Sequence, residues 1–291
     1  MIVVNPIAGG TDKQTFLYAL KALSEEIGFY YEVVRTRGAA DEAFLKKQYL
    51  HMKPCWLIAA GGDGTFNLVA RVALQVGCPV GIVPMGSANG LARELGMAAT
   101  PMAALRQILR GHVRAIDVLW INQRYLCIHM GDVGINADMV SRFQKAQGRG
   151  WWGYARHLIS ALWRSRARRY AISDLERGAY RCKRAHMVVI ANASSYGTGA
   201  LINPDGRLDD GFFELCIIKR ISLRSFVMVM LARFVHKYDH TPNIEYMHTR
   251  RARIQTRKPV LLQLDGEVIG RFQHIDIEVT PGALPILVGG S

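Results

Sequence analysis

The first 110 residues alternate between short apolar runs and longer amphipathic stretches, and this alternation limits the folds open to the chain. The runs predict strands at residues 2–5, 30–35, 56–60 and 80–83, and the stretches predict helices at residues 12–27, 40–50, 66–76, 87–95 and 101–110. Such a strand–helix–strand rhythm is typical of an α/β domain built on an open parallel sheet.

Beyond residue 112 the sequence becomes β-rich. Strands are expected at residues 113–121, 124–130, 186–192, 212–218, 244–256, 259–264 and 267–279, and helices only at residues 150–166 and 221–236. Runs of strands with short turns are typical of an antiparallel sandwich or barrel-like domain. We therefore predict an α/β domain over residues 1–112 and a β-rich domain over residues 113–291, closely apposed with a cleft between them.

Residues 61–65, Gly-Gly-Asp-Gly-Thr, join a buried strand to a helix. Glycines let consecutive backbone N–H groups face an anion, and the helix N-terminus adds partial positive charge. Asp63 fits such a turn if a divalent cation separates it from the anion, as in a nucleotide–Mg²⁺ complex. The alternative is an ordinary strand-to-helix turn with Thr65 as the N-cap.

A second glycine turn, Pro84-Met85-Gly86, follows the strand at residues 80–83, and Ser87 can cap the next helix. Taken alone, this segment is also compatible with an ordinary capped helix start. Because the carboxyl ends of neighbouring parallel strands face one crevice, we expect both turns to converge on one ligand.

These motifs resemble the diacylglycerol kinase catalytic-domain family, which includes bacterial soluble lipid kinases and the sphingosine and ceramide kinases. The matching segments are Asn5-Pro6, residues 61–65 with Asn67 and Val69, Pro84-x-Gly86-Ser87-x-Asn89-x-x-Ala92-Arg93, Asp117, residues 208–214 and residues 264–267. The resemblance implies a nucleotide-binding first domain, a lipid-substrate second domain, and a terminal strand after Pro281 that returns to the first domain.

The resemblance also implies an activity, namely transfer of the ATP γ-phosphate to a hydroxyl of a diacylglycerol-like lipid, with ATP and Mg²⁺ required. The implied nucleotide-binding residues are Thr36, Gly61, Gly62, Asp63, Gly64, Thr65, Asn67, Gly86, Ser87 and Asn89. The implied metal ligands are Asp63 and Asp117 near the nucleotide, and Asp210 with the carbonyls of Arg207 and Phe212 at a structural site.

Asp265 and Glu267 are the implied catalytic residues. Asp265 would accept the proton of the attacking hydroxyl, with Glu267 as a supporting carboxylate. From the residues alone, Asp265-Gly266 is simply a hairpin turn. Because Asn-Gly supports the same turn, we expect Asp265→Asn to leave the structure nearly unchanged.

The chain departs from the family pattern at two places. Leu68 and Gly90 stand where the family usually has acidic residues. In bacterial relatives the acid at the second position joins those matched by Asp63 and Asp117 in a water–Mg²⁺ network. The missing acid at residue 90 leaves three interpretations open: the protein binds metal more weakly, it uses another acidic residue instead, or it is catalytically silent.

The net charge is +14, and the excess of arginine and lysine is concentrated in residues 142–184, with tryptophan and tyrosine interleaved among them over residues 142–169. Such a segment suits an anionic membrane surface, although a solvated basic helix with core tryptophans explains it as well. Nucleic-acid binding is not expected, because no helix-turn-helix, zinc-finger or RNA-recognition signature is present.

The five cysteines form no CxxC pair, and residues 1–5 form an expected strand with no basic leader. We therefore expect a reducing, cytoplasmic setting with peripheral membrane association. The sequence leaves open which lipid is phosphorylated and whether the chain forms a homodimer. Two other functions remain open, a soluble NAD kinase-like enzyme and a non-enzymatic nucleotide- or membrane-binding protein.

Overall fold

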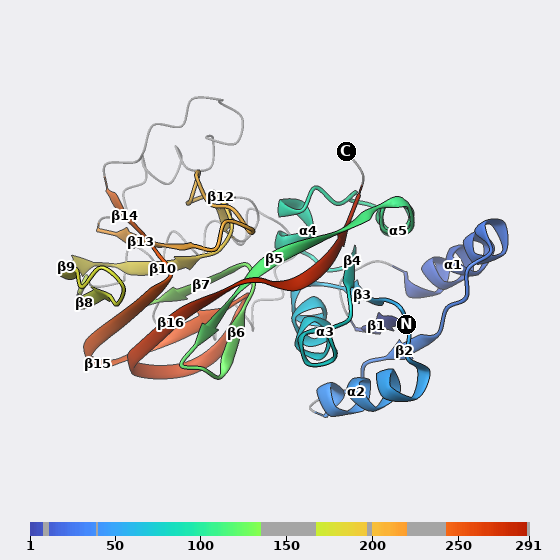
Figure 1. Cartoon of the computed structure of the whole chain (residues 1–291), viewed down its shortest axis with the longest axis horizontal. Coiled ribbons are helices and arrows are strands. Elements are labelled where there is room, and N and C mark those ends of the chain that lie inside the picture. The colour runs from blue at the N-terminus through green and yellow to red at the C-terminus, as the bar shows by residue number, and fades with distance from the viewer. Residues whose placement is uncertain (8–11, 39, 135–166, 197–199, 220–242, 290–291) are drawn as a thin grey trace. The chain divides into compact units, whose positions relative to one another are not determined.

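The computed structural model describes residues 1–7, 12–38, 40–134, 167–196, 200–219 and 243–289. Its contacts divide the chain into two compact units (Figure 1). Unit 1 comprises Met1–Ile116 and Gly282–Ser291, and unit 2 comprises Asp117–Pro281. The helices expected at residues 150–166 and 221–236 lie outside the described residues, as does most of the basic aromatic segment at residues 142–169.

Unit 1 contains a parallel sheet in the order β2-β1-β3-β4-β16. Its strands are β1 (Ile2–Val4), β2 (Val33–Arg35), β3 (Leu57–Gly61), β4 (Val80–Pro84) and the C-terminal end of β16 (Glu267–Val288). Within this sheet, Ile286 pairs with Val80 and Leu287 with Gly81. The fold thus confirms the predicted parallel sheet of the N-terminal region.

Helices cover both faces of this sheet (Figure 1). They are α1 (Lys13–Ile27), α2 (Asp41–Met52), α3 (Asp63–Val76), α4 (Gly90–Glu94) and α5 (Pro101–Arg110). Arg106 of α5 forms an ion pair with Glu26 of α1, and Gln75 of α3 donates a hydrogen bond to Glu42 of α2. These contacts join α1 with α5 and α2 with α3, which gives the doubly wound arrangement.

Local sequence explains where the helices begin and end. The Asp12 carboxylate accepts hydrogen bonds from the N–H groups of Gln14 and Thr15, so α1 begins at Lys13. Gly28 and Gly77 adopt the left-handed conformation that ends α1 and α3.

Unit 2 is built on antiparallel strands in the order β14-β13-β10-β7-β15-β16, with β8 on β15 and β9 on β8. The strands introduced here are β5 (His112–Ile121), β6 (Tyr125–Cys127), β7 (Met130–Val133), β8 (Arg168–Asp174), β9 (Tyr180–Ala185), β10 (Met187–Ala191), β11 (Ser195–Tyr196), β12 (Ala200–Leu201), β13 (Phe213–Ile218), β14 (Ile244–Thr249) and β15 (Arg251–Leu264). The antiparallel β-rich second half is confirmed. Strands β5 and β16 each contribute residues to both units.

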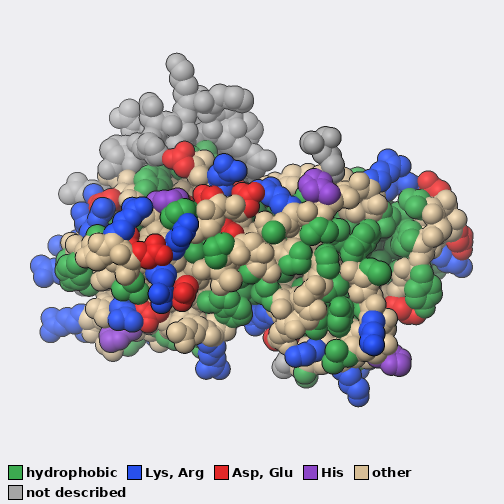
Figure 2. Space-filling model, viewed as in Figure 1, with side chains coloured by type: hydrophobic (Ala, Val, Ile, Leu, Met, Phe, Trp, Pro, Cys, Tyr) green, Lys and Arg blue, Asp and Glu red, His purple; other side chains and the backbone are tan. Residues whose placement is uncertain are grey.

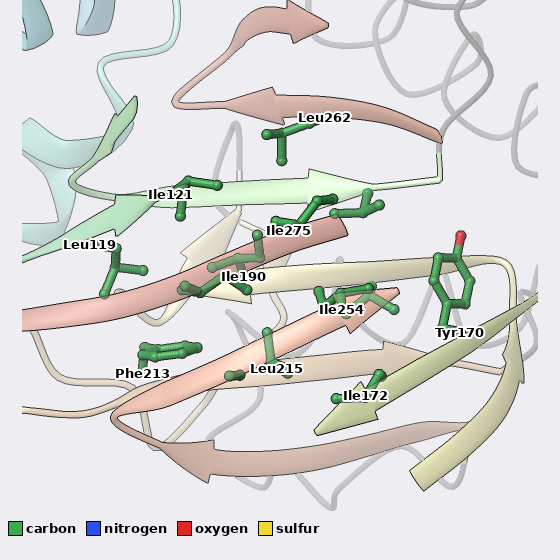
Figure 3. Close-up of a cluster of buried hydrophobic side chains, with 14 of the residues drawn as sticks. Leu119, Ile121, Tyr170, Ile172, Ile190, Phe213, Leu215, Ile254, Leu262 and Ile275 are labelled. Atoms are coloured by element: carbon green, nitrogen blue, oxygen red, sulfur yellow. The ribbon is translucent and has the colours of Figure 1, made fainter. Parts of the chain in front are cut away.

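The core of unit 2 comes from side chains that alternate along these strands. Leu262, Ile190, Phe213 and Ile275 belong to a single buried cluster (Figure 3). Each strand places every second side chain on the same face, so the strands bury one face in this cluster.

Several strands differ from the prediction. The strand expected at residues 124–130 is split into β6 and β7. The strand expected at residues 244–256 is interrupted at Arg250, and its second part continues to Leu264. The β8–β9 hairpin was not expected, because its many arginines obscure the alternation of the apolar side chains.

None of the helices in the described part of the chain is long and apolar enough to cross a membrane.

Candidate functional site

The parallel strands of unit 1 end at one edge of the sheet, and residues singled out by the resemblance follow them there. Asn5 follows β1 and Thr36 follows β2. The Asn5 side-chain amide donates a hydrogen bond of 3.2 Å to Thr65 Oγ1, and the Thr36 N–H donates one of 3.0 Å to the Val4 carbonyl. Ligands of open α/β sheets bind at this carboxyl edge.

The first glycine turn, residues 61–65, leads directly into α3, which begins at Asp63 rather than at residue 66. Gly62 is the N-cap residue, in an extended conformation and without a side-chain cap hydrogen bond. Thr65 is therefore not the N-cap; it is buried in the first helical turn. Since the first N–H groups of a helix have no acceptor within the helix, this uncapped start favours an external anion.

The second glycine turn, residues 84–89, is closed by Asn89. Its Oδ1 accepts a hydrogen bond of 2.9 Å from the Gly86 N–H, and its Nδ2 donates one of 2.8 Å to the Gly86 carbonyl. Asn89 also has a positive φ of 50° and precedes α4, which begins at Gly90. The expectation that Ser87 caps this helix is wrong, because the Asn89 bonds delay the helix and leave Ser87 exposed.

The two glycine turns meet, as the sequence predicted. A Cβ atom on Gly86 would lie 2.5 Å from the Gly62 Cα, so only glycine allows this approach of the two backbones. The Asp63 carboxylate adds a second link, since it accepts a long hydrogen bond of 3.3 Å from the Leu91 N–H. Both turns therefore contribute backbone to one small region of unit 1.

Asn67 lies one turn into α3 and is buried. Its Oδ1 accepts a hydrogen bond of 3.2 Å from Arg71 Nε, so the side chain is fixed within unit 1. Leu68, at the position where the family has an acid, is partly buried, and Gly90 opens α4.

A cluster near Thr36 was missed from the sequence. Asp41 is buried, and its carboxylate accepts hydrogen bonds of 2.7–2.9 Å from the N–H groups of Arg37 and Gly38. These bonds fix the backbone that follows Thr36. An aspartate three residues after a glycine, at the start of a helix, was the available signal.

The region around the two glycine turns fits a phosphate group. It offers an uncapped helix start, two glycines in close backbone contact and a partly exposed carboxylate, Asp63. Among the described residues, no group of three or more His, Cys, Asp or Glu side chains could hold a metal ion. A Mg²⁺ bound here would thus take most of its oxygen ligands from phosphate and water, which is usual for Mg²⁺ with nucleotides.

The turn between β15 and β16 in unit 2 contains Asp265, with a positive φ of 46°. Its Oδ2 accepts a hydrogen bond of 2.8 Å from the Ile128 N–H, and its Oδ1 accepts bonds of 2.9 and 3.0 Å from the N–H groups of His129 and Met130. The carboxylate therefore fixes the loop between β6 and β7. Burial raises the pKa of the Asp265 carboxyl above its usual range, and the N–H donors oppose that shift.

This geometry corrects the expectation that Asp265→Asn would be structurally nearly silent. An asparagine would place its NH₂ group either against the Ile128 N–H or against the N–H groups of His129 and Met130. The turn sequence alone gave no sign of these long-range bonds. Glu267, by contrast, is exposed at the start of β16.

The Cys127 thiol lies beside Asp265 and was not considered from the sequence. Its Sγ donates a hydrogen bond of 3.6 Å to Asp265 Oδ1. Burial raises the pKa of the Cys127 thiol well above its ordinary value, so the sulfur keeps its proton and acts as a donor.

The predicted structural metal site occupies the loop before β13. Asp210 is partly buried, and its Oδ1 accepts a hydrogen bond of 3.0 Å from the Phe212 N–H. The loop is also held by Asp117, whose buried carboxylate accepts a bond of 2.7 Å from the Gly211 N–H. Arg207 is exposed. One carboxylate with two carbonyls is an oxygen donor set that suits a hard cation.

Asn192, at the end of β10, connects these two parts of unit 2 and was also missed. Its fully buried side-chain amide donates hydrogen bonds of 3.0 Å to the Asp117 carbonyl and 2.7 Å to the Ile128 carbonyl. The loop before β13 and the loop held by Asp265 thus share one buried anchor.

Comparison with known families explains this combination of features. The diacylglycerol kinase catalytic domain model matches residues 1–121, and the YegS C-terminal NAD kinase β-sandwich-like domain model matches residues 131–288. The chain belongs to the diacylglycerol kinase catalytic-domain family. The family implies ATP use and typically a divalent metal.

Curated relatives extend over nearly the whole chain at low identity. A diacylglycerol kinase of Staphylococcus epidermidis is 26% identical over 290 residues, covering 95% of this chain and 90% of the relative. A diacylglycerol kinase of Bacillus subtilis strain 168 is 24% identical over 277 residues, covering 92% of this chain and 89% of the relative. These names support a kinase-type transferase in general terms.

Solved structures confirm the fold. A crystal structure of a diacylglycerol kinase from Bacillus anthracis str. Sterne has a TM-score of 0.74 at 19% identity, covering 99% of this chain and 96% of that one. A second crystal structure from the same organism, with the same coverage and identity, has a TM-score of 0.80.

Proposed function

We propose that this family member is an ATP-dependent lipid kinase that transfers the γ-phosphate of ATP to a hydroxyl of a diacylglycerol-like lipid. The observation that carries the proposal is the meeting of the two glycine turns at Gly62 and Gly86. Phosphoryl transfer depends mainly on positioning and charge stabilisation of phosphate, and closely packed backbone N–H groups supply both.

In this proposal unit 1 binds the nucleotide. The uncapped start of α3 holds phosphate oxygens through its N–H groups. In the second glycine turn the Gly86 backbone is bonded to Asn89, so Gly86 provides the close approach of the two turns and Ser87 presents its backbone N–H to the same anion. Thr36 contacts the nucleotide from the end of β2. Asp63 would hold the Mg²⁺ that neutralises phosphate charge, whereas Asp117 belongs to unit 2 and is a metal ligand only by the resemblance.

Asp265 in unit 2 receives the proton in this proposal. The lipid hydroxyl oxygen forms a bond to the γ-phosphorus, the bond to the oxygen that bridges the β- and γ-phosphorus atoms breaks, and ADP leaves with that oxygen. The hydroxyl proton passes to the Asp265 carboxylate. Its raised pKa supports this role, because a base whose pKa lies nearer the working pH releases and takes protons more readily.

A loop braced by Asp117 and Asn192 supports a separate structural role for Asp210. With the carbonyls of Arg207 and Phe212 it would hold a hard cation that stiffens the segment before β13. Glu267 is assigned only a supporting charge beside Asp265.

The test is phosphate transfer from [γ-³²P]ATP with Mg²⁺ to diacylglycerol, phosphatidylglycerol and a sphingoid base in mixed micelles, with NAD in a parallel reaction. The proposal is supported if ³²P appears in a lipid product and if the Asp63→Asn variant forms much less of that product than the unaltered protein. Label in NADP instead would make the chain an NAD kinase-like enzyme. ATP binding without transfer to any acceptor would indicate a silent protein, consistent with the losses at Leu68 and Gly90.

A further inference from the structure

The hairpin formed by β8 and β9, residues 168–185, lies at an edge of the unit 2 sheet, since β9 pairs only with β8 among the described strands. Its tip is fixed. The Asp174 carboxylate accepts hydrogen bonds of 3.0 Å from the N–H groups of Glu176 and Arg177, and the Leu175 N–H donates one of 2.9 Å to the Arg251 carbonyl. The hairpin is therefore a preformed surface.

This hairpin is strongly basic. Its cations are Arg168, Arg169, Arg177, Arg181, Lys183 and Arg184, and its carboxylates are Asp174 and Glu176. Lysine and arginine side chains gather at this end of unit 2 (Figure 2, left of the view, where Figure 1 labels β8 and β9). Because Asp174 is buried, little negative charge offsets them at the surface.

The two faces of β9 differ in how their cations are used. Arg181 and Lys183 project to one face and contact the Glu245 carboxylate at 2.7 and 3.0 Å, where Lys219 joins them at 2.8 Å. Burial alone would raise the pKa of Glu245, but hydrogen bonds from these three cations lower it to about 2. The cations of this face are thus engaged within unit 2.

The opposite face carries an arginine pair without such a partner. Arg169 and Arg184 lie directly opposite each other across the two strands, and both are exposed. Like charges in this position destabilise a sheet. Within the described part of the chain, neither guanidinium has a carboxylate partner, so an external anion would relieve their repulsion.

Exposed apolar groups accompany the arginine pair. Tyr180 lies on the same face of β9 as Arg184 and is 64% exposed, and Leu175 at the tip is 44% exposed. An aromatic side chain beside arginines is typical of the membrane interface, where the ring lies among the headgroups. Nucleic acid would attract the arginines, but it would offer no apolar environment for the exposed Leu175 side chain.

We propose that the exposed face of the β8–β9 hairpin docks on an anionic lipid bilayer, with Arg169 and Arg184 contacting headgroup phosphates and Tyr180 and Leu175 lying in the interface. The preference for a bilayer over nucleic acid rests partly on the proposed lipid substrate. Docking is measured as vesicle binding without phosphate transfer, so its test does not depend on the kinase activity.

The experiment compares the whole protein with Arg169→Gln/Arg184→Gln by sedimentation with vesicles of phosphatidylcholine containing phosphatidylglycerol, and with vesicles of phosphatidylcholine alone. Each basic residue near an anionic surface contributes about fivefold, so the double variant should bind anionic vesicles about 25-fold more weakly at low salt. Raising the salt should reduce the difference. Tyr180→Ser should weaken binding in a manner that salt changes little.

Lys21→Gln/Lys47→Gln is the matched control, because both lysines are exposed in unit 1 and the charge change is the same. It should bind vesicles like the unaltered protein. Thermal denaturation should show that Arg169→Gln/Arg184→Gln is at least as stable as the unaltered protein, since a like-charge pair is removed.

Three outcomes would overturn the proposal. The first is equal vesicle binding by Arg169→Gln/Arg184→Gln and the unaltered protein, and the second is an equal loss in the lysine control. The third is tighter binding to a single-stranded or duplex oligonucleotide than to anionic vesicles, with that binding lost in the arginine variant.

Loss of vesicle binding in the arginine variant with full phosphorylation of micellar lipid would support docking and leave the kinase assignment intact. Vesicle binding without any kinase activity would contradict only the proposed function.

Discussion

Two aspartate–glycine turns of this chain look alike in sequence but are held together differently. Asp63 in unit 1 is partly exposed and accepts one long hydrogen bond, from the Leu91 N–H at 3.3 Å. Asp265 in unit 2 accepts three backbone hydrogen bonds of 2.8–3.0 Å. The first turn is held by glycine backbones in contact, and the second by its carboxylate. Replacing each aspartate should therefore have different structural costs.

The largest effect is expected for Asp265→Asn. Loss of an acceptor for buried N–H groups should lower the free energy of unfolding by about 1–3 kcal/mol. If Asp265 is also the general base, kcat should fall by about 10²–10⁴-fold, measured at a temperature where both proteins are folded. Glu267→Gln is the control, because an exposed residue should change stability by less than about 0.5 kcal/mol. An Asp265→Asn protein as stable as the unaltered one would remove the contrast between the two turns.

Asp63→Asn should show the reverse pattern. Its single long hydrogen bond contributes little, so the free energy of unfolding should change by less than about 1 kcal/mol. Phosphate transfer from ATP–Mg²⁺ should fall by about 10²-fold, as when one preorganised charged group is removed from an active site. Chemical denaturation and initial rates at several Mg²⁺ concentrations measure the two quantities. Unchanged rates would exclude Asp63 from metal binding.

Glycine replacements separate the two turns by a different mechanism. In Gly86→Ala the new Cβ would lie 2.5 Å from the Gly62 Cα, so the backbones must separate and stability should fall by about 1–3 kcal/mol. In Gly266→Ala nothing lies within 4 Å of the new Cβ, and the positive φ of 86° alone should cost about 1–2 kcal/mol. Only Gly86→Ala should also weaken ATP binding, which calorimetry can measure. Equal loss of ATP binding in both would contradict this division.

The smallest effect is expected for Glu245→Gln, away from both turns. Its pKa of about 2 in the folded protein lies below the ordinary value of 4.5. Its stabilising contribution is therefore full above about pH 4.5 and is lost as the pH falls towards 2. Because the cations around it are partly exposed, the contribution should be below about 1 kcal/mol. In denaturation curves, the difference in the free energy of unfolding between the two proteins should shrink as the pH falls from 4.5 to 2. A difference that stays constant would contradict the lowered pKa of Glu245.

Local pattern was enough to predict the parallel sheet of unit 1, because buried strands, caps and glycine turns there are contiguous in sequence. The meeting of Gly62 and Gly86 followed from the rule that parallel strands end at one edge. Asp117 and Asp265 were selected through the family resemblance, and the roles that it implies for them remain predictions. The roles of Asn192 and the Ile128–Met130 backbone could not be predicted, because each depends on hydrogen bonds between residues far apart in the chain.

The start of α4 shows a second limit. Ser87 and Asn89 are equally good N-cap residues by type, but the Asn89 side chain binds back to Gly86 and the helix starts at Gly90. Two residues competed for one turn, and propensity could not choose between them. The β8–β9 hairpin was missed for a related reason, since the alternation of Tyr170 and Ile172 is hidden among arginines.

The pairing of β16 with β4 has a consequence for biosynthesis. Val80 and Gly81 are synthesised 206 residues before their partners Ile286 and Leu287. At a synthesis rate of 5–20 residues per second, the outer edge of β4 stays unpaired for roughly 10–40 s before the end of β16 is made. An unpaired apolar strand edge is a template for aggregation. The nascent chain is therefore most exposed to misassembly in this interval, and a nonsense mutation before residue 286 would prolong it indefinitely.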